Sequence, residues 1–291
     1  MLLIFGLGYC GAAVAAAARA RGDTVVGITR GAPALPATIG FEAAGPAIAA
    51  ASHLLVTAAP DAAGDPVLAR HGAAIAAAVR AGGLRWIGYL SSTVVYGNRD
   101  GGWVDEATPP APSGPRGVRR REAEMAWAAV AGPVALDLVR LAGIYGPGRS
   151  VFDDLRAGRA RRIAKPGHAF GRIHRDDIVR AVLAAIDRPG HGVRVLNLAD
   201  DTPAESAAVV AHAARLLGVP VPPAVPFAEA AASMSPMALS FWADNRKVAS
   251  RATQAALGIA WRYPSYREGL DAILAEERGQ HGVQQGEVGS A

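Results

Sequence analysis

The chain has 291 residues, of which 51% are hydrophobic, and its mean hydropathy is +0.19. This length allows one large α/β domain with a smaller lobe, or two domains, and the composition supplies a sizeable core. The formal net charge is +5 and the pI is about 9.8, but Lys165 and Lys247 are the only lysines. The arginines are not grouped as a recognition helix or interleaved with aromatic residues, so we expect no nucleic-acid partner.

The cysteine count and the apolar segments exclude further classes. Cys10 is the only cysteine, which excludes an intrachain disulfide, a cysteine zinc cluster and a Cys–Cys redox pair. No segment holds about eighteen uninterrupted apolar residues, and the N-terminal apolar run lacks a basic leader and is broken by glycines. We therefore expect no membrane partner, no signal peptide, no metal site and a cytoplasmic location. The oligomeric state stays open between monomer and homodimer.

The first thirty residues predict a dinucleotide-binding unit. A strand, a glycine loop, an alanine-rich helix and a second strand follow one another over residues 2–5, 6–11, 12–21 and 24–28. Gly6 permits the tight turn, Gly8 lets the backbone approach a pyrophosphate, and Gly11 lets the helix pack closely on the strand. The N-terminus of the helix offers free N–H groups and a partial positive charge to the phosphates. We expect Tyr9 and Cys10, in the same loop, to contact the cofactor too.

The end of the second strand indicates which dinucleotide is preferred. An NAD site usually places Asp or Glu about twenty residues past the glycines, where it binds the adenosine ribose. Thr29 and Arg30 occupy that position here, and no carboxylate does. A carboxylate would repel a ribose 2′-phosphate, whereas Arg30 could pair with it. We therefore favour NADP(H) and keep NAD(H) open, since Arg30 could also be a solvated arginine at a strand end.

Strand and helix patterns alternate at short intervals along the chain. Further strands are expected at 52–60, 85–90 and 193–198, with helices at 66–81, 203–218 and 266–277. This alternation predicts an α/β fold, a doubly wound parallel sheet of the Rossmann type.

The same pattern predicts the division of the chain. The dinucleotide-binding domain covers 1–150, and about 171–200 completes its sheet. A small C-terminal substrate lobe covers 151–170 and 201–277, and the Gly-, Gln- and Ser-rich segment 278–291 is expected to be a flexible tail. The strand at 52–60 ends in small residues, which are Thr57, Ala58 and Ala59. Small side chains at this strand end allow a cofactor to approach closely.

Four segments together resemble the extended short-chain dehydrogenase/reductase family, in its NAD-dependent epimerase/dehydratase group. They are the opening glycine loop, SSTVVYG (91–97), RLAGIYGPG (140–148) and RIHRDDI (172–178). The resemblance spans residue 1 to about residue 277. It implies a bound dinucleotide whose contacts include Ser91 and Ile144. Ile144 belongs to the segment 140–148, which the resemblance places near the nicotinamide.

The catalytic helix departs from the family pattern. In the family, a Ser orients the substrate oxygen, a Tyr exchanges a proton, and a Lys four residues later holds the nicotinamide ribose and lowers the pKa of the Tyr. Ser92 matches the Ser, but counting back from Glu124 puts Arg116 in the Tyr position and Arg120 in the Lys position. No Tyr-x-x-x-Lys exists anywhere in the chain. Arg120 can still donate to a ribose hydroxyl or phosphate, whereas Arg116 stays protonated near neutral pH and cannot act as a general acid or base.

Another group would then have to move the proton in an oxidoreductase. Tyr145 and Tyr96 follow strands at the carboxyl edge of the sheet, where ligands bind. His174 and the Asp105–Glu106 pair are further candidates. Each of these residues also has an ordinary structural interpretation.

Residues 151–175 hold seven basic residues, which are Arg156, Arg159, Arg161, Arg162, Lys165, Arg172 and Arg175. This segment could pair with a phosphate or carboxylate of the substrate, such as a nucleotide-linked sugar, or it could be a solvated basic face. The leading hypothesis is an atypical NAD(P)-dependent reductase, dehydrogenase or epimerase for a small anionic hydroxyl or keto substrate. The rival is a catalytically silent dinucleotide-binding sensor or interaction protein.

Overall fold

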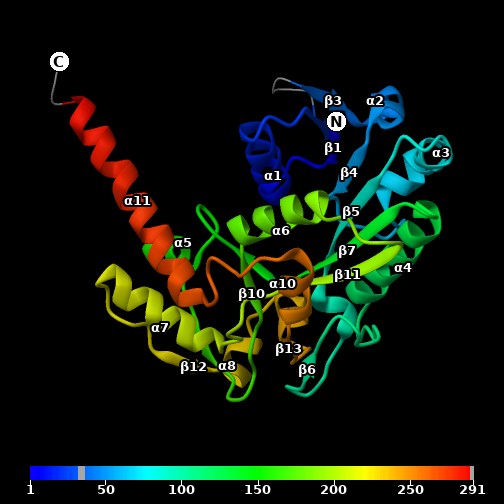
Figure 1. The fold of residues 1–291 in the computed structure, drawn as a ribbon. Helices are drawn as coiled ribbons and strands as arrows, with labels where there is room; N and C mark the ends of the chain where they lie inside the picture. Colours follow the sequence, from blue (N-terminus) through cyan, green and yellow to red (C-terminus); the bar gives the residue numbers. More distant parts are fainter. Residues whose placement is uncertain (32–36, 289–291) are drawn as a thin grey trace.

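A seven-stranded parallel sheet forms the centre of the molecule (Figure 1). The computed structural model describes residues 1–31 and 37–288. The sheet order is β11-β7-β5-β4-β1-β2-β3, and three two-stranded pairs, β10–β8, β12–β9 and β13–β6, lie outside it. The strands are β1 (Leu2–Phe5), β2 (Val25–Thr29), β3 (Thr38–Gly40), β4 (His53–Val56), β5 (Trp86–Ser92), β6 (Trp103–Val104), β7 (Ala135–Leu141), β8 (Gly143–Tyr145), β9 (Arg162–Ala164), β10 (Arg172–His174), β11 (Val193–Leu198), β12 (Ala224–Pro226) and β13 (Lys247–Val248). The predicted doubly wound α/β fold is confirmed.

Helices cover both faces of the sheet, which is why β1 is apolar throughout. Leu2 and Ile4 join the core beneath α1, α6 and α10, while Leu3 and Phe5 join the core beneath α2, α3 and α4. The helices are α1 (Tyr9–Ala20), α2 (Gly45–Ala50), α3 (Pro66–Arg80), α4 (Pro115–Ala131), α5 (Val151–Arg156), α6 (Arg175–Asp187), α7 (Ser206–Leu217), α8 (Phe227–Ala231), α9 (Pro236–Trp242), α10 (Arg251–Leu257) and α11 (Tyr266–Val288), with 3₁₀ turns at Phe41–Ala43 and Thr93–Tyr96.

The strand order creates a crevice at the carboxyl edge of the sheet. From β1 the chain winds outward through β2 to β3 and then returns to β4 on the other side of β1. Phe5 pairs in register with Ile28 of β2 and Val56 of β4, so the residues after all three strands emerge at one edge. Ligands of open α/β sheets bind where the winding direction reverses in this way.

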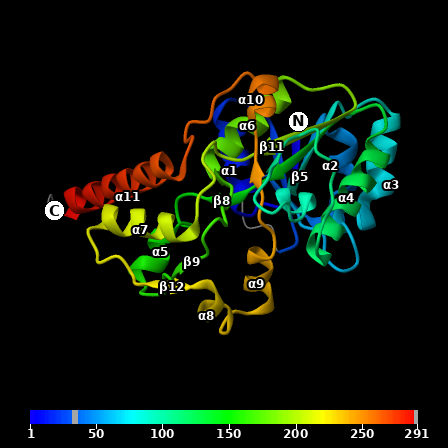
Figure 2. The ribbon, with the colours of Figure 1, turned by 90° about the horizontal axis from the view of Figure 1, so that it is seen from below.

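A smaller lobe lies beside this edge. Its core joins Phe152 of α5, Val209 of α7 and Leu270 of α11, and β9 pairs with β12 along its side (Figures 1 and 2). The sequence predicts a helix ending at 277 and a flexible tail after it, but α11 continues to Val288. The last residues of that predicted tail, 289–291, lie outside the described residues.

The segment 140–148 contains the end of one strand and the whole of another. β7 ends at Leu141, and the chain then leaves the main sheet to form β8, which pairs with β10. The backbone N–H of Gly143 donates to the carbonyl of Gly171, so partners about thirty residues downstream decide the break. None of the described helices has the length and apolarity that a membrane crossing requires.

A buried ion pair ties α4 to the centre of the sheet. Arg140 of β7 donates to Glu124 of α4 through Nε at 3.0 Å and Nη2 at 2.7 Å, and both side chains are 4% exposed. The Ser91 hydroxyl donates to the same carboxylate at 2.5 Å, and the Arg140 guanidinium lies over the Tyr96 ring. The network therefore connects α4, the helix that carries Arg116 and Arg120, to β5 and β7.

We expect Glu124→Gln to lower the free energy of unfolding by about 3 kcal/mol, because it leaves the Arg140 charge buried without a counter-ion. Urea denaturation followed by circular dichroism measures the loss. Glu122→Gln, at an exposed position of the same helix, is the control and should change the value by less than about 0.5 kcal/mol. A loss below about 1 kcal/mol in Glu124→Gln would contradict this role.

Candidate functional site

Two of the three loop glycines are required by the packing of the chain itself. Gly6 has φ +97°, and a Cβ there would lie 2.5 Å from Oγ1 of Thr57. A Cβ on Gly11 would lie 2.0 Å from the carbonyl oxygen of Gly6, so α1 can approach β1 only without a side chain at this position. The Thr57 hydroxyl donates to the same carbonyl at 2.8 Å and holds the turn against β4.

Gly8 has a different reason to be glycine. Its φ of −74° is open to any residue, and a Cβ there would meet no protein atom within 4 Å. Gly8 is the N-cap of α1, and no side chain caps that helix end. Neither backbone strain nor packing therefore requires glycine here. The open space in front of the first N–H groups of α1 fits a phosphate group that approaches the backbone.

A cavity of about 700 Å³ begins at this point and runs along the carboxyl edge of the sheet towards the small lobe. Its walls come from the glycine loop, the residues after β4, the end of β5, α4, the β7–β8 connection, the segment 169–172 and the end of α9. Its volume is in the range of cofactor and substrate pockets. The cavity therefore connects the phosphate-binding end of α1 to residues of the lobe.

Solved structures share this architecture almost from end to end. A conserved protein of unknown function from Silicibacter pomeroyi is 42% identical with a TM-score of 0.87, and the match covers 95% of this chain and 98% of that one. MoeE5, solved with UDP-glucuronic acid and NAD, is 22% identical with a TM-score of 0.75, over 96% of this chain and 99% of that one. The human epimerase family protein SDR39U1, solved with NADPH, is 19% identical with a TM-score of 0.74, over 94% and 99%.

The fold is that of the extended short-chain dehydrogenases/reductases. Among curated proteins, a 3-diazoavenalumate denitrifying reductase of a Streptomyces species is 30% identical over 181 residues, which are 58% of this chain. The chain spans about half of the length of that relative, since the match covers 55% of it. No family model matches the chain.

Part of the expected short-chain dehydrogenase/reductase cofactor set lines the cavity and part does not. The expected contacts on the cavity wall are Gly8, Tyr9, Cys10, Thr57, Ser91, Arg120 and Ile144. Those absent from the wall are Gly6, Gly11, Thr29, Arg30, Ala58 and Ala59. Gly6 and Gly11 shape the turn from behind, and Arg30 is exposed one residue beyond β2. Cys10 is buried, and burial raises the pKa of its thiol.

Arg120, at the position predicted for the family's lysine, is held against β5. Its Nη1 donates to the Tyr89 hydroxyl and to the Leu90 carbonyl oxygen, each at 3.0 Å. Ser92 also faces the cavity, and its hydroxyl accepts a hydrogen bond from the backbone N–H of Val94 at 3.3 Å. That contact leaves the Ser92 hydroxyl proton available for an oxygen of a ligand.

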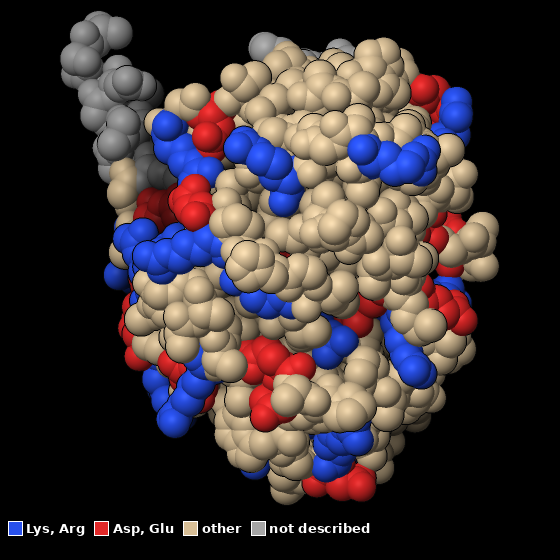
Figure 3. All heavy atoms as spheres, turned by 45° about the vertical axis from the view of Figure 1, so that its right-hand side comes forward, with Lys and Arg blue, Asp and Glu red and all other residues tan. Residues whose placement is uncertain are grey.

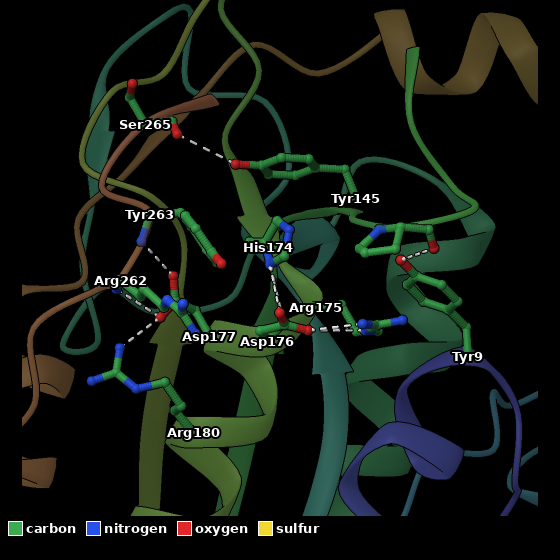
Figure 4. A network of polar contacts seen from close by, with 11 residues as sticks. Tyr9, Tyr145, His174, Arg175, Asp176, Asp177, Arg180, Arg262, Tyr263 and Ser265 are labelled. Atoms are coloured by element: carbon green, nitrogen blue, oxygen red, sulfur yellow. Dashed lines mark hydrogen bonds and ion pairs between the residues drawn. The ribbon is translucent and has the colours of Figure 1, made fainter. Parts of the chain in front are cut away.

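Tyr145 lines the cavity, but its hydroxyl is directed elsewhere. It donates to the carbonyl oxygen of Ser265 at 3.3 Å, on the side away from Tyr9 (Figure 4). Burial and the nearby Asp200 raise the pKa of this phenol. A tyrosine that donates to a backbone carbonyl and holds its proton this firmly is poorly suited to general acid catalysis.

The other proton-donor candidates lie off the cavity wall. The buried Tyr96 hydroxyl contacts Oδ1 of Asn197 at 2.8 Å and the Asp105 carbonyl oxygen at 2.9 Å, and burial raises its pKa. His174 caps α6 by accepting from the N–H of Asp176, and burial lowers its pKa, which favours the neutral ring (Figure 4). Glu106 accepts from the Thr253 hydroxyl at 2.6 Å. The Asp105 carboxylate binds the turn that follows it.

Most of the basic segment 151–175 is committed to contacts within the lobe. Arg156 pairs with Glu277, Arg159 with Asp154 and Arg175 with Asp176. Further side chains of the segment donate to carbonyl or hydroxyl oxygens; they are Arg161, Arg162, Lys165 and Arg172. Of the seven, only Arg172 is on the cavity wall. On the face shown in Figure 3, basic and acidic side chains are mixed, with no single basic patch.

The cavity has other cations that the sequence analysis did not assign to a site. Arg149 and Arg246 line the wall, as Arg116 does. The Arg149 guanidinium lies 5.6 Å from the centroid of the Tyr9 ring. Arg149 follows the YGPG segment directly, and this position in the sequence could have predicted that it lines the cavity. Nothing in the sequence near Arg246 predicts this, because Arg246 reaches the cavity from 130 residues beyond Arg116. The described residues hold no group of three His, Cys, Asp or Glu side chains suited to a metal.

We expect Gly8→Ala to separate cofactor binding from stability. Its Cβ meets no protein atom, so the free energy of unfolding should change by about 1 kcal/mol at most. The methyl group would occupy the space in front of the α1 N–H groups and weaken NADPH binding about tenfold or more. Calorimetry and urea denaturation measure the two effects.

Gly72→Ala is the matched control, because Gly72 lies in α3 and also leaves an added Cβ without contacts. It should leave NADPH affinity unchanged. Equal NADPH affinity of Gly8→Ala and wild type would show that no phosphate approaches this position.

Proposed function

We propose that this protein is an NADP(H)-dependent reductase of a small-molecule substrate, with its active site in the cavity that begins at Gly8. The observation that carries the proposal is the space at Gly8, which neither strain nor packing explains. NAD is bound in one solved neighbour and NADPH in another, and a curated relative is named as a reductase. The nicotinamide cofactor, when bound, would supply a hydride to the substrate.

The residues present fit such a cofactor. The uncapped N-terminus of α1 would hold the pyrophosphate, and Arg149, on the same wall, could add a cation there. Arg120 would hold the ribose in place of the family lysine, since holding a hydroxyl needs only a positioned donor. Arg30, exposed beyond β2 with no carboxylate beside it in the sequence, would pair with the 2′-phosphate of NADP(H).

The chain would manage the reacting oxygen without a tyrosine acid. The Ser92 hydroxyl can donate to the substrate oxygen and orient it, while Arg116 and Arg120 keep their protons and contribute positive charge. Neither Tyr96 nor Tyr145 has a hydroxyl free to protonate a substrate. Water that enters the cavity would therefore supply any proton that the product requires.

This assignment favours a single hydride transfer over epimerisation. Epimerisation through a transient ketone removes a proton from one oxygen and later returns it, which calls for a group that titrates beside that oxygen. The guanidinium groups at the Tyr and Lys positions cannot do this. A reduction that ends with proton uptake from water needs no such group.

The cofactor preference is tested by calorimetric titration of NADPH and NADH into wild type and Arg30→Ala. We expect NADPH to bind more tightly in wild type, and the variant to lose about tenfold for NADPH and nothing for NADH, because only NADPH carries the 2′-phosphate. Arg80→Ala, an arginine at the end of α3, is the control. NADH binding that is tighter and independent of Arg30 would overturn the NADP assignment and keep the site. Binding of neither nucleotide would overturn the reductase.

Turnover should depend little on pH between about 6 and 9. The arginines of the cavity stay charged, and the pKa values of the wall residues Tyr9, Cys10 and Tyr145 are raised, so none of these groups is expected to change protonation in this range. Initial rates of NADPH oxidation, with an acceptor found by screening carbonyl compounds, measure the profile. Tyr145→Phe and Tyr96→Phe should retain turnover wherever they fold. A change in the rate of NADPH oxidation near neutral pH that disappears in Tyr145→Phe would identify this tyrosine as the proton donor.

NADPH binding without turnover of any acceptor would support the catalytically silent sensor instead of the reductase.

A further inference from the structure

The charges on the cavity wall are strongly unbalanced. Among the described wall residues, Asp244 provides the only carboxylate, whereas five arginines line the same wall. These are Arg116, Arg120, Arg149, Arg172 and Arg246. Arg120 donates to oxygens of β5, Arg172 donates to the carbonyl oxygens of Phe170 and Ala204, and Arg149 lies beside the glycine loop. Arg116 and Arg246 are the wall arginines next to α9, because the Arg116 guanidinium lies over the Phe241 ring and Arg246 follows that helix in the chain.

Arg116 is a cation without a counter-ion among the described residues. No ion pair or hydrogen bond there involves its side chain, and its guanidinium lies 4.7 Å from the centroid of the Phe241 ring. Partial burial and the positive charges of Arg120 and Arg119 lower its pKa from the ordinary value. Burial and the neighbouring guanidinium groups therefore both disfavour the charge that Arg116 carries, and a bound anion would relieve this.

Arg246 is positioned more rigidly. Its Nη1 donates to the carbonyl oxygen of Gly97 and to Oδ2 of Asp244, each at 3.0 Å, and its side chain is only 14% exposed. The Ser113 hydroxyl donates to the same Asp244 carboxylate. Burial lowers the pKa of Arg246, and Arg116 is among the charges that lower it further, so the two guanidinium groups lie within electrostatic reach. One carboxylate does not neutralise this pair.

Aromatic side chains form the adjoining wall. Phe170, Phe241 and Trp242 all line the cavity, and the Phe170 and Trp242 rings meet edge to face at 4.9 Å. Phe241 is 52% exposed, so about half of this large apolar residue beside the Arg116 guanidinium has no protein packing. An exposed ring next to an uncompensated cation fits a ligand that is flat and apolar at one end and anionic at the other.

We propose that Arg116 and Arg246 form an oxyanion subsite, which binds the carboxylate or phosphate of a substrate whose planar, aromatic body lies against Phe241 and Trp242. This assignment rests on the proposed function, because it names the substrate class of the same cavity. It also gives Arg116 a role that its place on α4 implies. Where the family has a tyrosine that exchanges a proton, this chain has a fixed cation that holds an anion.

The test uses four small probes that separate the charge from the ring. Cinnamate carries an aromatic carboxylate, phenyl phosphate an aromatic phosphate, cinnamamide the same ring system as cinnamate without the charge, and cyclohexanecarboxylate a carboxylate without a planar ring. Each is titrated by calorimetry into the full chain, first alone and then with NADP⁺ present. We expect cinnamate or phenyl phosphate to bind at least about tenfold more tightly than cinnamamide, and the tighter of the two identifies the oxyanion.

Substitutions assign the contact. Arg116→Gln and Arg246→Gln should each weaken the preferred anion about tenfold or more and leave cinnamamide unchanged, and Phe241→Leu should weaken every aromatic probe several-fold. Arg121→Gln, at an exposed position of α4 off the cavity wall, is the matched control and should bind like wild type. Arg246 also holds the loop at Gly97, so Arg116→Gln, whose side chain makes no such bond, remains decisive if Arg246→Gln fails to fold.

The outcomes separate this inference from the reductase itself. Wild type that binds NADPH, but binds cinnamate and phenyl phosphate no better than cinnamamide, would overturn the oxyanion subsite and leave the reductase. Wild type that binds the anions but neither nucleotide would keep the subsite and overturn the reductase. Cyclohexanecarboxylate binding equal to that of cinnamate would overturn the aromatic part of the proposal, and an unchanged affinity in Arg116→Gln would overturn its placement.

Discussion

The close contact of α1 with β1 at Gly11 is the constraint on which the site depends. A side-chain atom at Gly11 would lie 2.0 Å from the carbonyl oxygen of Gly6, so the helix can start directly above the strand only because this residue has no Cβ. Thr57 of the neighbouring strand end donates to that same carbonyl and fixes the turn from the other side. The result is an α1 N-terminus without a side-chain cap, whose first residues line the cavity at the edge of the sheet, and a helix N-terminus favours a phosphate electrostatically.

Around this helix end, arginines stand where the resemblance to the short-chain dehydrogenases/reductases predicts titrating groups. The spacing to Glu124 puts Arg116 and Arg120 at the positions on α4 expected for the tyrosine and the lysine. A buried ion pair between Glu124 and Arg140 positions that helix, so the substitution stands on a rigid support. Guanidinium groups bind and orient anions well but do not exchange protons near neutral pH.

The small lobe completes the cavity from distant parts of the sequence. Arg246 and Phe241 reach it from the end of α9, and Phe170 and Arg172 reach it from the segment that leads into β10. β10 pairs with β8 and so joins this segment to the end of β7, while β13 pairs with β6 and anchors the residues after Arg246. These short pairs, outside the main sheet, decide which side chains surround the end of the cavity next to α9.

The sequence by itself determined the alternation of strands and helices that makes a doubly wound fold, the glycine loop and the absence of a Tyr-x-x-x-Lys pair, because each depends on local spacing. The apolar strand 2–5, the three glycines and the alanine-rich helix specify a strand–loop–helix unit through steric and hydrogen-bonding rules that act within a few residues. The tertiary structure alone decided the rest. It directed the hydroxyls of Tyr96 and Tyr145 to Asn197 and Ser265, more than one hundred residues away, and joined much of the basic segment 151–175 to oxygens within the lobe. It also brought Arg246 to the cavity that Arg116 lines, since contacts between residues so far apart depend on packing that no local pattern encodes.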